Sequence, residues 1–113
     1  MSSSPPYYTE YQGSLQVLES QMHWTEIKDG SRIYVTGIVT NRSTNAWRDL
    51  EFECRFFDGS GAMVDAAHAR GSLTINPHDD SAFRVAVTPG TASNQYRTCA
   101  VSVSTARNTK GPF

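Results

Sequence analysis

The chain has 113 residues and a formal net charge of −1, with 38% apolar and 19% charged residues. This length suits one domain with one core, and no apolar run approaches the roughly 18 residues of a membrane-spanning helix. Because Lys and Arg are scattered among acids, no basic surface is expected for phosphate backbones. We therefore expect no nucleic-acid partner and no direct membrane insertion by this chain.

Residues 1–13 carry serines, two prolines and three tyrosines without periodicity, which predicts a flexible N-terminal tail. An alternative is that the tyrosines form a recognition segment. A short C-terminal tail is expected at residues 108–113. These limits leave residues 14–107 as a single β-sandwich domain.

The first predicted strand covers residues 15–27, and its apolar positions change parity near Gln21, which predicts a β-bulge. Residues 28–31 are an Asp-Gly hairpin turn that leads into the next strand. Residues 33–41 alternate strictly between apolar and polar positions, as half-buried strands do. The positions that share one face there are Ile33, Val35, Gly37 and Val39.

A polar turn at residues 41–45 precedes a second strictly alternating strand at residues 50–56. Its inward positions are Leu50, Phe52, Cys54 and Phe56. Residues 58–61 predict a second hairpin, with extended structure resuming at residues 62–66. Residues 66–70 are compatible with a brief helical turn before a short strand at residues 73–75.

Residues 76–80 form a predicted turn, residues 83–87 a strand ended by Pro89 and Gly90, and residues 96–105 the last strand. The last strand places Arg97, Cys99, Val101 and Val103 on one face. Seven strand segments at roughly ten-residue spacing predict an all-β fold. We expect an immunoglobulin-like antiparallel β-sandwich of about seven strands.

Three segments resemble motifs of the FxLYD domain family. Residues 35–41 resemble its apolar-x-Gly-x-Val-x-Asn strand, residues 54–61 its Phe-x-Leu-Tyr-Asp motif before a Gly turn, and residues 75–83 its Leu-x-Pro-Gly-x-x-x-x-Phe segment. Cys54 stands where the family has Phe, and His78 where it has Gly.

The resemblance implies a small immunoglobulin-like β-sandwich, commonly the extracytoplasmic portion of bacterial membrane-anchored proteins or lipoproteins, with no assigned activity. It transfers no catalytic residue, because the motif positions are structural: Gly37 lets a bulky neighbour pack, Asn41 caps a turn, and Asp58 with Gly61 makes a bend. We expect an extracytoplasmic location, periplasmic or cell-surface, if an anchor or signal has been removed, and a cytoplasmic one otherwise.

Cys54 and Cys99 share the inward parity. A disulfide between them would close a loop of about 45 residues, which the loop-entropy model values at roughly 4 kcal/mol. The alternative is two free buried thiols that pack as small apolar side chains. Both alternatives stay open, because parity does not show whether the strands lie within bridging distance.

Met and His are copper ligands, but the spacing of these residues does not support a metal site. Met22 and His23 are neighbours on opposite faces of a strand, and no His-x-Met pair is present. We predict no metal ligands and no cofactor. Without paired carboxylates, a Cys and His pair or a cofactor motif, we predict no catalytic residues and do not expect an enzyme.

Two candidate binding surfaces remain. We expect Trp24 in the core and Trp47 at least half exposed, where it would serve recognition, although we favour the alternative that Trp47 plugs the end of the core. The second surface is an uncharged edge segment that could accept an added strand from a peptide or a second copy, giving a homodimer, unless its neighbours cover it. Its residues are Ser72, Leu73, Thr74 and Ile75.

The leading hypothesis is a non-enzymatic binding or interaction module, an accessory domain of a bacterial cell-envelope protein with a protein or peptide partner. A purely structural spacer domain is one alternative. A small copper-chaperone-like protein is the other.

Overall fold

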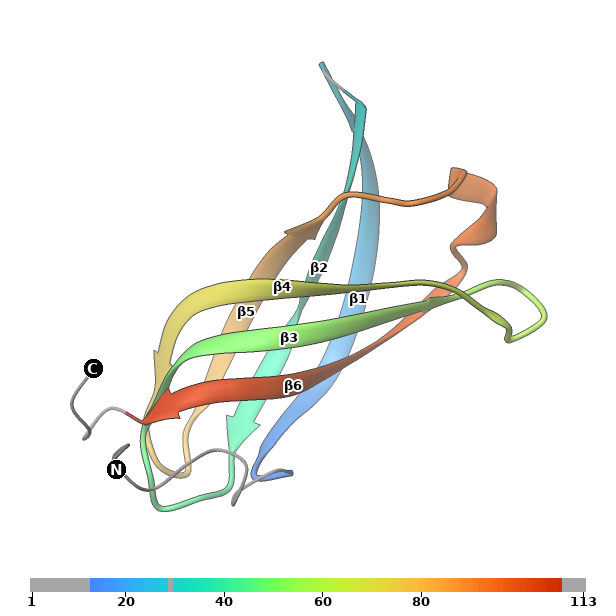
Figure 1. Ribbon diagram of the computed structural model, residues 1–113. Helices are drawn as coiled ribbons and strands as arrows, with labels where there is room; N and C mark the ends of the chain where they lie inside the picture. The colour runs from blue at the N-terminus through green and yellow to red at the C-terminus, as the bar shows by residue number, and fades with distance from the viewer. Residues whose placement is uncertain (1–12, 29, 109–113) are drawn as a thin grey trace, which may run out of the picture.

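Two packed antiparallel sheets make up the computed structural model, which describes residues 13–28 and 30–108 (Figure 1). The elements are β1 (Leu15–Ile27), β2 (Gly30–Asn41), β3 (Trp47–Phe57), β4 (Met63–Ile75), β5 (Asp80–Val87), the 3₁₀ turn η2 (Ser93–Gln95) and β6 (Thr98–Asn108). The all-β sandwich prediction is confirmed, with six strands among the described residues in place of about seven. The two predicted tails lie outside the described residues, apart from Gly13 and Asn108.

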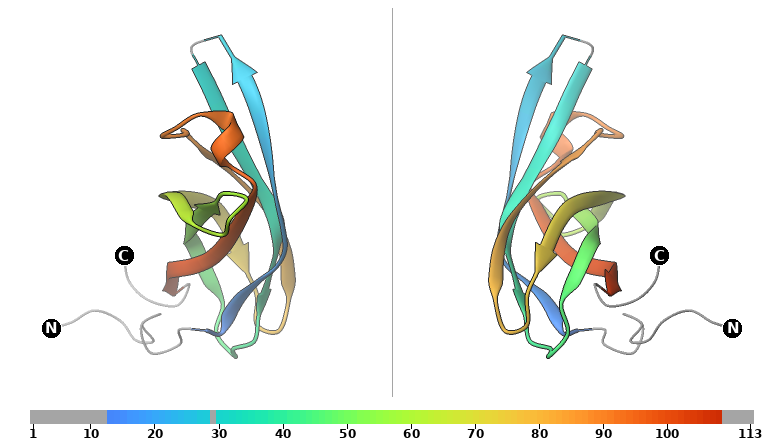
Figure 2. Two further views of the ribbon diagram at one scale, coloured as in Figure 1. Left: turned by 90° about the vertical axis from the view of Figure 1, so that its right-hand side faces the viewer. Right: turned by 90° about the vertical axis from the view of Figure 1, so that its left-hand side faces the viewer.

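One sheet has the order β1-β2-β5 and the other β4-β3-β6. Figure 2 shows the sheets face to face, with the β1–β2 hairpin extending beyond the second sheet. β1 lies against β6 at one side of the sandwich, and β5 lies against β4 at the other. The four edge strands of the two sheets are therefore β1, β5, β4 and β6.

The alternation of β2, β3 and β5 fills the core. Successive side chains of a strand point to opposite faces, so every second residue of these strands is buried between the sheets. The ring of Phe52 stacks on that of Phe83 with centroids 4.3 Å apart. The core side chains from these strands are Ile33, Val35, Val39, Trp47, Leu50, Phe52, Cys54, Phe56, Phe83, Val85 and Val87.

The predicted bulge in β1 is confirmed, because the register with β2 shifts between Leu18 and Gln21. Glu19 has a φ of 47° there. A Cβ atom on Gly37 would lie 2.8 Å from the ring of Phe83 and 2.9 Å from the carbonyl oxygen of Glu19. Gly37 thus leaves room for Phe83 and for the bulged backbone, as the prediction of a bulky neighbour required.

β4 differs from the prediction, because one strand of 13 residues replaces a strand, a helical turn and a short strand. Two of its small residues, Ala67 and Ala69, pack against the hydrophobic core. A Cβ atom on Gly71 would lie 3.0 Å from the ring of Phe52. Packing against the neighbouring strand thus overrides the helix preference of alanine, and the merged segment accounts for the lower strand count.

Asn41 is buried and ties the end of β2 to the end of β4. Its amide nitrogen donates to the carbonyl oxygens of Asn45 at 2.8 Å and Asn76 at 3.0 Å. Its side-chain oxygen accepts from the backbone N–H of Ser43 at 2.9 Å. The role predicted for Asn41 in the turn is confirmed, and its reach to β4 extends that role.

Candidate functional site

Trp47 does not form a binding surface. The side chain is fully buried, and its Nε1–H donates to Ser43 Oγ at 3.0 Å. The expectation of a half-exposed Trp47 is wrong, and the alternative that it plugs the end of the core is confirmed. Trp24 is partly buried and packs against the core from β1.

The predicted edge segment is the end of β4, an edge strand of its sheet, but only part of it is accessible. Ser72 and Thr74 are exposed and Leu73 is half-buried, whereas Ile75 is a core residue. The carbonyl oxygen of Ile75 accepts from Asn41 Nδ2 at 3.3 Å. The inclusion of Ile75 in an exposed surface is therefore wrong, because its side chain and its carbonyl are already engaged.

The two cysteines are free thiols that face inward from adjacent strands. Cys99 is opposite Phe56 and Cys54 opposite Val101, so the cysteines occupy diagonal positions. Diagonal residues of an antiparallel pair have Cα atoms about 7–8 Å apart, beyond the usual bridging range. The disulfide stays a prediction that this register does not favour.

Neither thiol is activated as a nucleophile. Burial raises the pKa of Cys54 to about 11, and the neighbouring Cys99 and Glu53 act in the same direction. Burial also raises the pKa of Cys99, against a hydrogen bond with Ser20 that lowers it. Reactive thiols need a lowered pKa, so both cysteines behave as packing residues.

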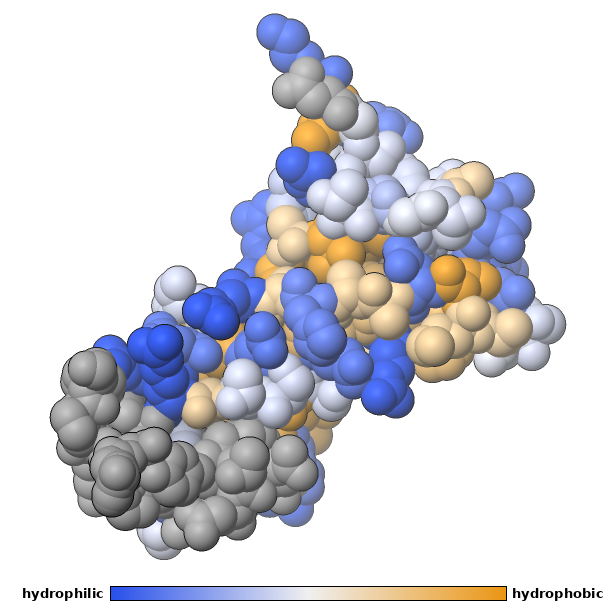
Figure 3. Space-filling view, in the orientation of Figure 1, coloured by the Kyte–Doolittle hydropathy of each residue, from blue (hydrophilic) through white to orange (hydrophobic). Residues whose placement is uncertain are grey.

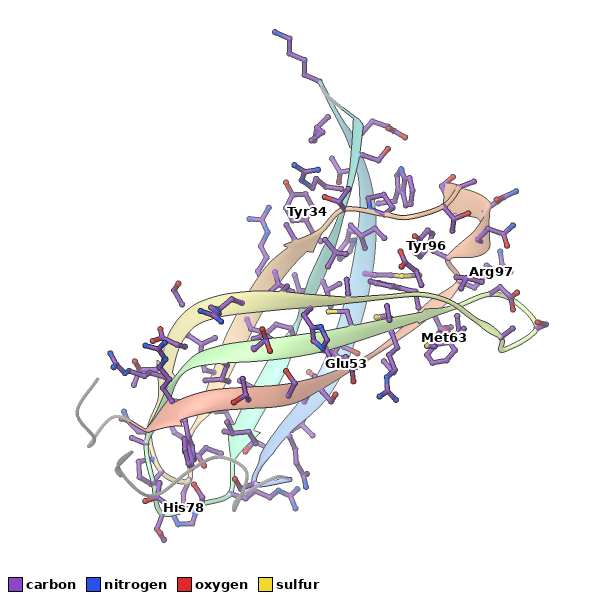
Figure 4. The ribbon with its side chains drawn as sticks, in the orientation of Figure 1. Tyr34, Glu53, Met63, His78, Tyr96 and Arg97 are labelled. Carbon is purple, nitrogen blue, oxygen red and sulfur yellow. The ribbon has the colours of Figure 1, made fainter. Side chains whose placement is uncertain are left out.

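The histidines are dispersed. Figure 4 places His78 at the opposite end of the sandwich from Tyr96, with Glu53, whose carboxylate lies 3.7 Å from His68 Nε2, between the two ends. Within residues 13–28 and 30–108, no group of three or more His, Cys, Asp or Glu side chains could hold a metal ion. No helix in that part of the chain is long and apolar enough to cross a membrane.

The outer face of the β4-β3-β6 sheet is a solvated, ion-paired surface. Glu53 pairs with Arg55 at 2.9 Å, and Ser104 Oγ donates to the carbonyl oxygen of Glu51 at 3.1 Å. Figure 3 shows polar residues across this face and apolar ones gathering toward the β3–β4 hairpin, where Met63 is more than half exposed. A single exposed apolar side chain such as that of Met63 needs no functional explanation, because much of any protein surface is apolar.

Tyr96, which is not among the residues predicted from sequence, organises the end of the sandwich opposite to His78 (Figure 4). Its hydroxyl donates to Asp65 Oδ2 at 2.6 Å and accepts from the backbone N–H groups of Gly90 at 2.9 Å and Thr91 at 3.3 Å. Burial raises the pKa of Tyr96, and the hydrogen bond to Asp65 acts in the same direction. A tyrosine just before an alternating strand, six positions after Gly90, was the available sequence signal.

A hollow of about 190 Å³ opens beside Tyr96, under the β1–β2 hairpin. The rings of Trp24 and Tyr96 meet there with centroids 5.5 Å apart and planes tilted by 49°. The ring of Tyr96 also meets that of Phe56 edge-on, with ring centroids 5.3 Å apart, and this contact fixes the Tyr96 ring. The residues that line this Trp24–Tyr96 hollow are Met22, Trp24, Ile33, Ser93 and Tyr96.

The edge of β6 that faces away from β3, here called the β6 edge, differs from the other three sheet edges. In the described part of the chain, no strand pairs with it. Residues 98–106 contain neither charge nor proline, so that Arg107 near the end of β6 is its charged residue, and the register with β3 is regular from Thr98 to Val103. The inward side chains of Cys99, Val101 and Val103 are only partly buried, whereas those of β3 opposite are fully buried.

The other edge strands carry the features that usually discourage strand addition. β1 has the bulge after Leu18, and β4 and β5 are interrupted by charge. The charged residues on these strands are Glu19 and Glu26 in β1, Asp65 and Arg70 in β4, and Asp80 and Arg84 in β5. The β6 edge is thus the least protected of the four.

The sequence matches no protein-family model and no curated protein. A solved structure described as the X-ray structure of Northeast Structural Genomics Consortium target SoR45 is similar, with a TM-score of 0.46 and 12% sequence identity over 86% of each chain. A similarity of this size carries no argument about function, so the FxLYD resemblance stays a prediction.

Proposed function

We propose that this chain is a non-enzymatic interaction module that binds an extended segment of a partner protein along the β6 edge. The observation that supports the proposal most strongly is the uncharged, proline-free and regular backbone of residues 98–103 on an edge strand whose inward side chains are partly exposed. An added strand would pair with the outward-facing backbone groups of β6. It would also cover the inward side chains that the sandwich leaves open.

The layout of the strands indicates where an added strand would fit. In an immunoglobulin sandwich, the strands C, F and G form one sheet, with G beside F. We assign β3 to C and β6 to F, so a strand in the G position would lie on the β6 edge, where the described residues place none. The partner segment would therefore complete the sandwich.

Tyr96 supports the immunoglobulin-like assignment. A tyrosine near the start of strand F, with its hydroxyl bonded to backbone a few residues upstream, is the tyrosine corner of such folds. Tyr96 precedes β6 and binds the N–H groups of Gly90 and Thr91 in that way. The role of accessory domain in a bacterial cell-envelope protein is supported by the FxLYD resemblance alone.

The test selects ten-residue peptides displayed on phage against the folded protein and then measures their affinity for Ala100→Pro and Val101→Pro. Backbone N–H groups of a strand alternate between its two sides, so one of these prolines removes only an edge-facing donor. Circular dichroism identifies it as the variant that keeps the wild-type spectrum. We expect that variant to lose about tenfold or more in affinity, the equivalent of one or two net hydrogen bonds.

The matched control is the folded member of the pair Ser72→Pro and Leu73→Pro on the β4 edge, which should leave affinity unchanged. Equal binding by the folded β6 proline variant would place the site elsewhere. Failure to select any peptide would favour the spacer alternative. Sedimentation of the wild type shows separately whether a second copy is the partner.

A further inference from the structure

Each of the two aromatic side chains that line the Trp24–Tyr96 hollow donates a hydrogen bond to a carboxylate. Trp24 Nε1–H donates to Glu26 Oε1 at 3.0 Å, and the hydroxyl of Tyr96 donates to Asp65 Oδ2 at 2.6 Å. A ring that donates a hydrogen bond to an anion carries more negative charge on its face. Both aromatic faces are thus better suited to a cation than isolated rings would be.

Both carboxylates are held in their charged form. Hydrogen bonds from Ser31 and then from Trp24 lower the pKa of Glu26. Burial acts to raise the pKa of Asp65, but hydrogen bonds from Tyr96, Gly90 and Ala66 outweigh it and leave the pKa below its ordinary value. The hollow therefore lies in a negative local field at neutral pH.

Two arginines that neighbour lining residues of the hollow in sequence have their side chains directed away from it. Arg32 alternates with the inward-facing Ile33, so it belongs to the outer face of its sheet, where it donates to Thr88 Oγ1 at 3.2 Å. The side chain of Arg97 lies against Gly59 in the β3–β4 turn. Neither guanidinium is positioned to occupy the aromatic walls itself.

We propose that the Trp24–Tyr96 hollow binds a methylated ammonium group, of the kind found in choline-type molecules and in methylated lysine. Cation–π contact with tryptophan and tyrosine is the usual way in which proteins hold such groups. Met22, Ile33 and Ser93 complete the lining. This inference goes beyond the proposed function and does not depend on strand addition at the β6 edge.

The size of the hollow fits one such group. A cavity of about 150 Å³ accommodates a benzene molecule, so the 190 Å³ here suffices for a trimethylammonium group with its attached carbon. Its positive charge would be stabilised by the two ring faces and the two carboxylates. An uncharged group of the same shape would keep only the apolar contacts.

The test is a nuclear magnetic resonance titration with choline and with 3,3-dimethyl-1-butanol, its uncharged isostere. The indole N–H signal of Trp24 reports on the hollow, and that of the fully buried Trp47 is an internal reference. We expect choline to shift the Trp24 signal with millimolar affinity and the isostere to bind about fivefold or more weakly, in line with a partly exposed cation–π contact.

Glu26→Gln keeps an acceptor for Trp24 Nε1–H and removes one charge, so we expect choline to bind about two- to threefold more weakly. Asp80→Asn removes the same charge at the other end of the sandwich and should leave the affinity unchanged. If both variants lose the same affinity for choline, the effect depends on the net charge of the protein alone, and the proposal is overturned.

Two further outcomes would overturn it. If choline and its isostere bind equally, the hollow is an apolar pocket without cation preference. If neither shifts the Trp24 signal at about 50 mM, an affinity too weak for a specific site, the hollow is not a site for this group. The folded β6 proline variant should bind choline like the wild type, which separates this test from the test of the proposed function.

Discussion

Tyr96 illustrates how much a single hydroxyl can hold in place. It joins the carboxylate of Asp65 on β4 to the backbone of Gly90 and Thr91 in the loop before β6. Removal of the hydroxyl would leave the N–H of Thr91 without this partner and would take a hydrogen bond from the charged carboxylate of Asp65, which keeps the N–H of Gly90 at 3.0 Å. A hydrogen bond to a charged group contributes more stability than an ordinary one.

We therefore expect Tyr96→Phe to lower the free energy of unfolding by about 1–3 kcal/mol, measured by urea denaturation. Tyr34→Phe is the matched control, because the ring of Tyr34 lies 4.4 Å from the Arg84 guanidinium and its hydroxyl has no hydrogen bond within the described residues. A similar loss in both variants would show that the hydroxyl of Tyr96 has no special role.

The same contact predicts a dependence of stability on pH. The pKa of Asp65 is lower in the folded protein than its ordinary value, so this carboxyl contributes stability above its unfolded pKa of about 4. That contribution is lost as the pH falls through the lower, folded pKa. Asp65→Asn should therefore flatten the acid limb of stability against pH, measured by urea denaturation between about pH 2 and 7. An unchanged acid limb would contradict the assignment.

Tyr96 acts at the opposite end of the pH range. Its pKa is raised in the folded protein, so it contributes stability below its unfolded pKa of about 10, and the contribution is lost as the pH rises through the folded value. Tyr96→Phe should remove this alkaline component along with the hydrogen bonds. Both ends of the profile thus depend on the same pair of side chains.

At the scale of the elements, β1, β2 and β5 meet at Gly37. The bulge of β1 brings the carbonyl of Glu19 toward β2 from one side, and the ring of Phe83 reaches it from β5. We expect Gly37→Ala to destabilise the protein by about 1–3 kcal/mol, the usual cost of overpacking, measured by urea denaturation. Gly59→Ala is the control, since its nearest neighbour would lie 3.9 Å from the new Cβ atom. Equal stability of the two variants would contradict the packing described for the bulge.

The sequence predicts β2, β3 and β5 because each buries one face, which leaves a strict alternation in the residue pattern. It predicts the bulge in β1 for the same reason, since a change of parity is itself a pattern. β4 is different: Gly71 is small because the ring of Phe52 on the neighbouring strand lies over it. That cause is a contact across the sheet, which no local pattern records.

The candidate sites likewise divide into features with a local sequence pattern and features that depend on contacts between distant residues. The burial of Trp47 depends on Ser43 and on the closed end of the sandwich, and the hollow depends on Trp24 and Tyr96 meeting across 72 positions of sequence. Neither contact has a local signature. The uncharged run in β6 was visible in the sequence, but its significance required the sheet order, which makes β6 an edge strand.

At the scale of the whole molecule, the sandwich is closed on one side and open on the other. β4 and β5 are joined by a short turn, and Asn41 fastens that turn to the end of β2. On the opposite side, β1 and β6 lie against each other without a connecting turn between them, and their inward residues other than Leu15 are only partly buried. Strand addition at the β6 edge would close this open side.

Amide hydrogen exchange along β6 tests most directly whether the β6 edge is unpaired, because it reports which backbone N–H groups already have partners. An unpaired β6 edge predicts an alternating pattern from Thr98 to Val103: amides directed at β3 exchange slowly, and those directed at the β6 edge exchange rapidly. Protection of every consecutive amide in this stretch would contradict it, because the β6 edge would then already be paired with another strand.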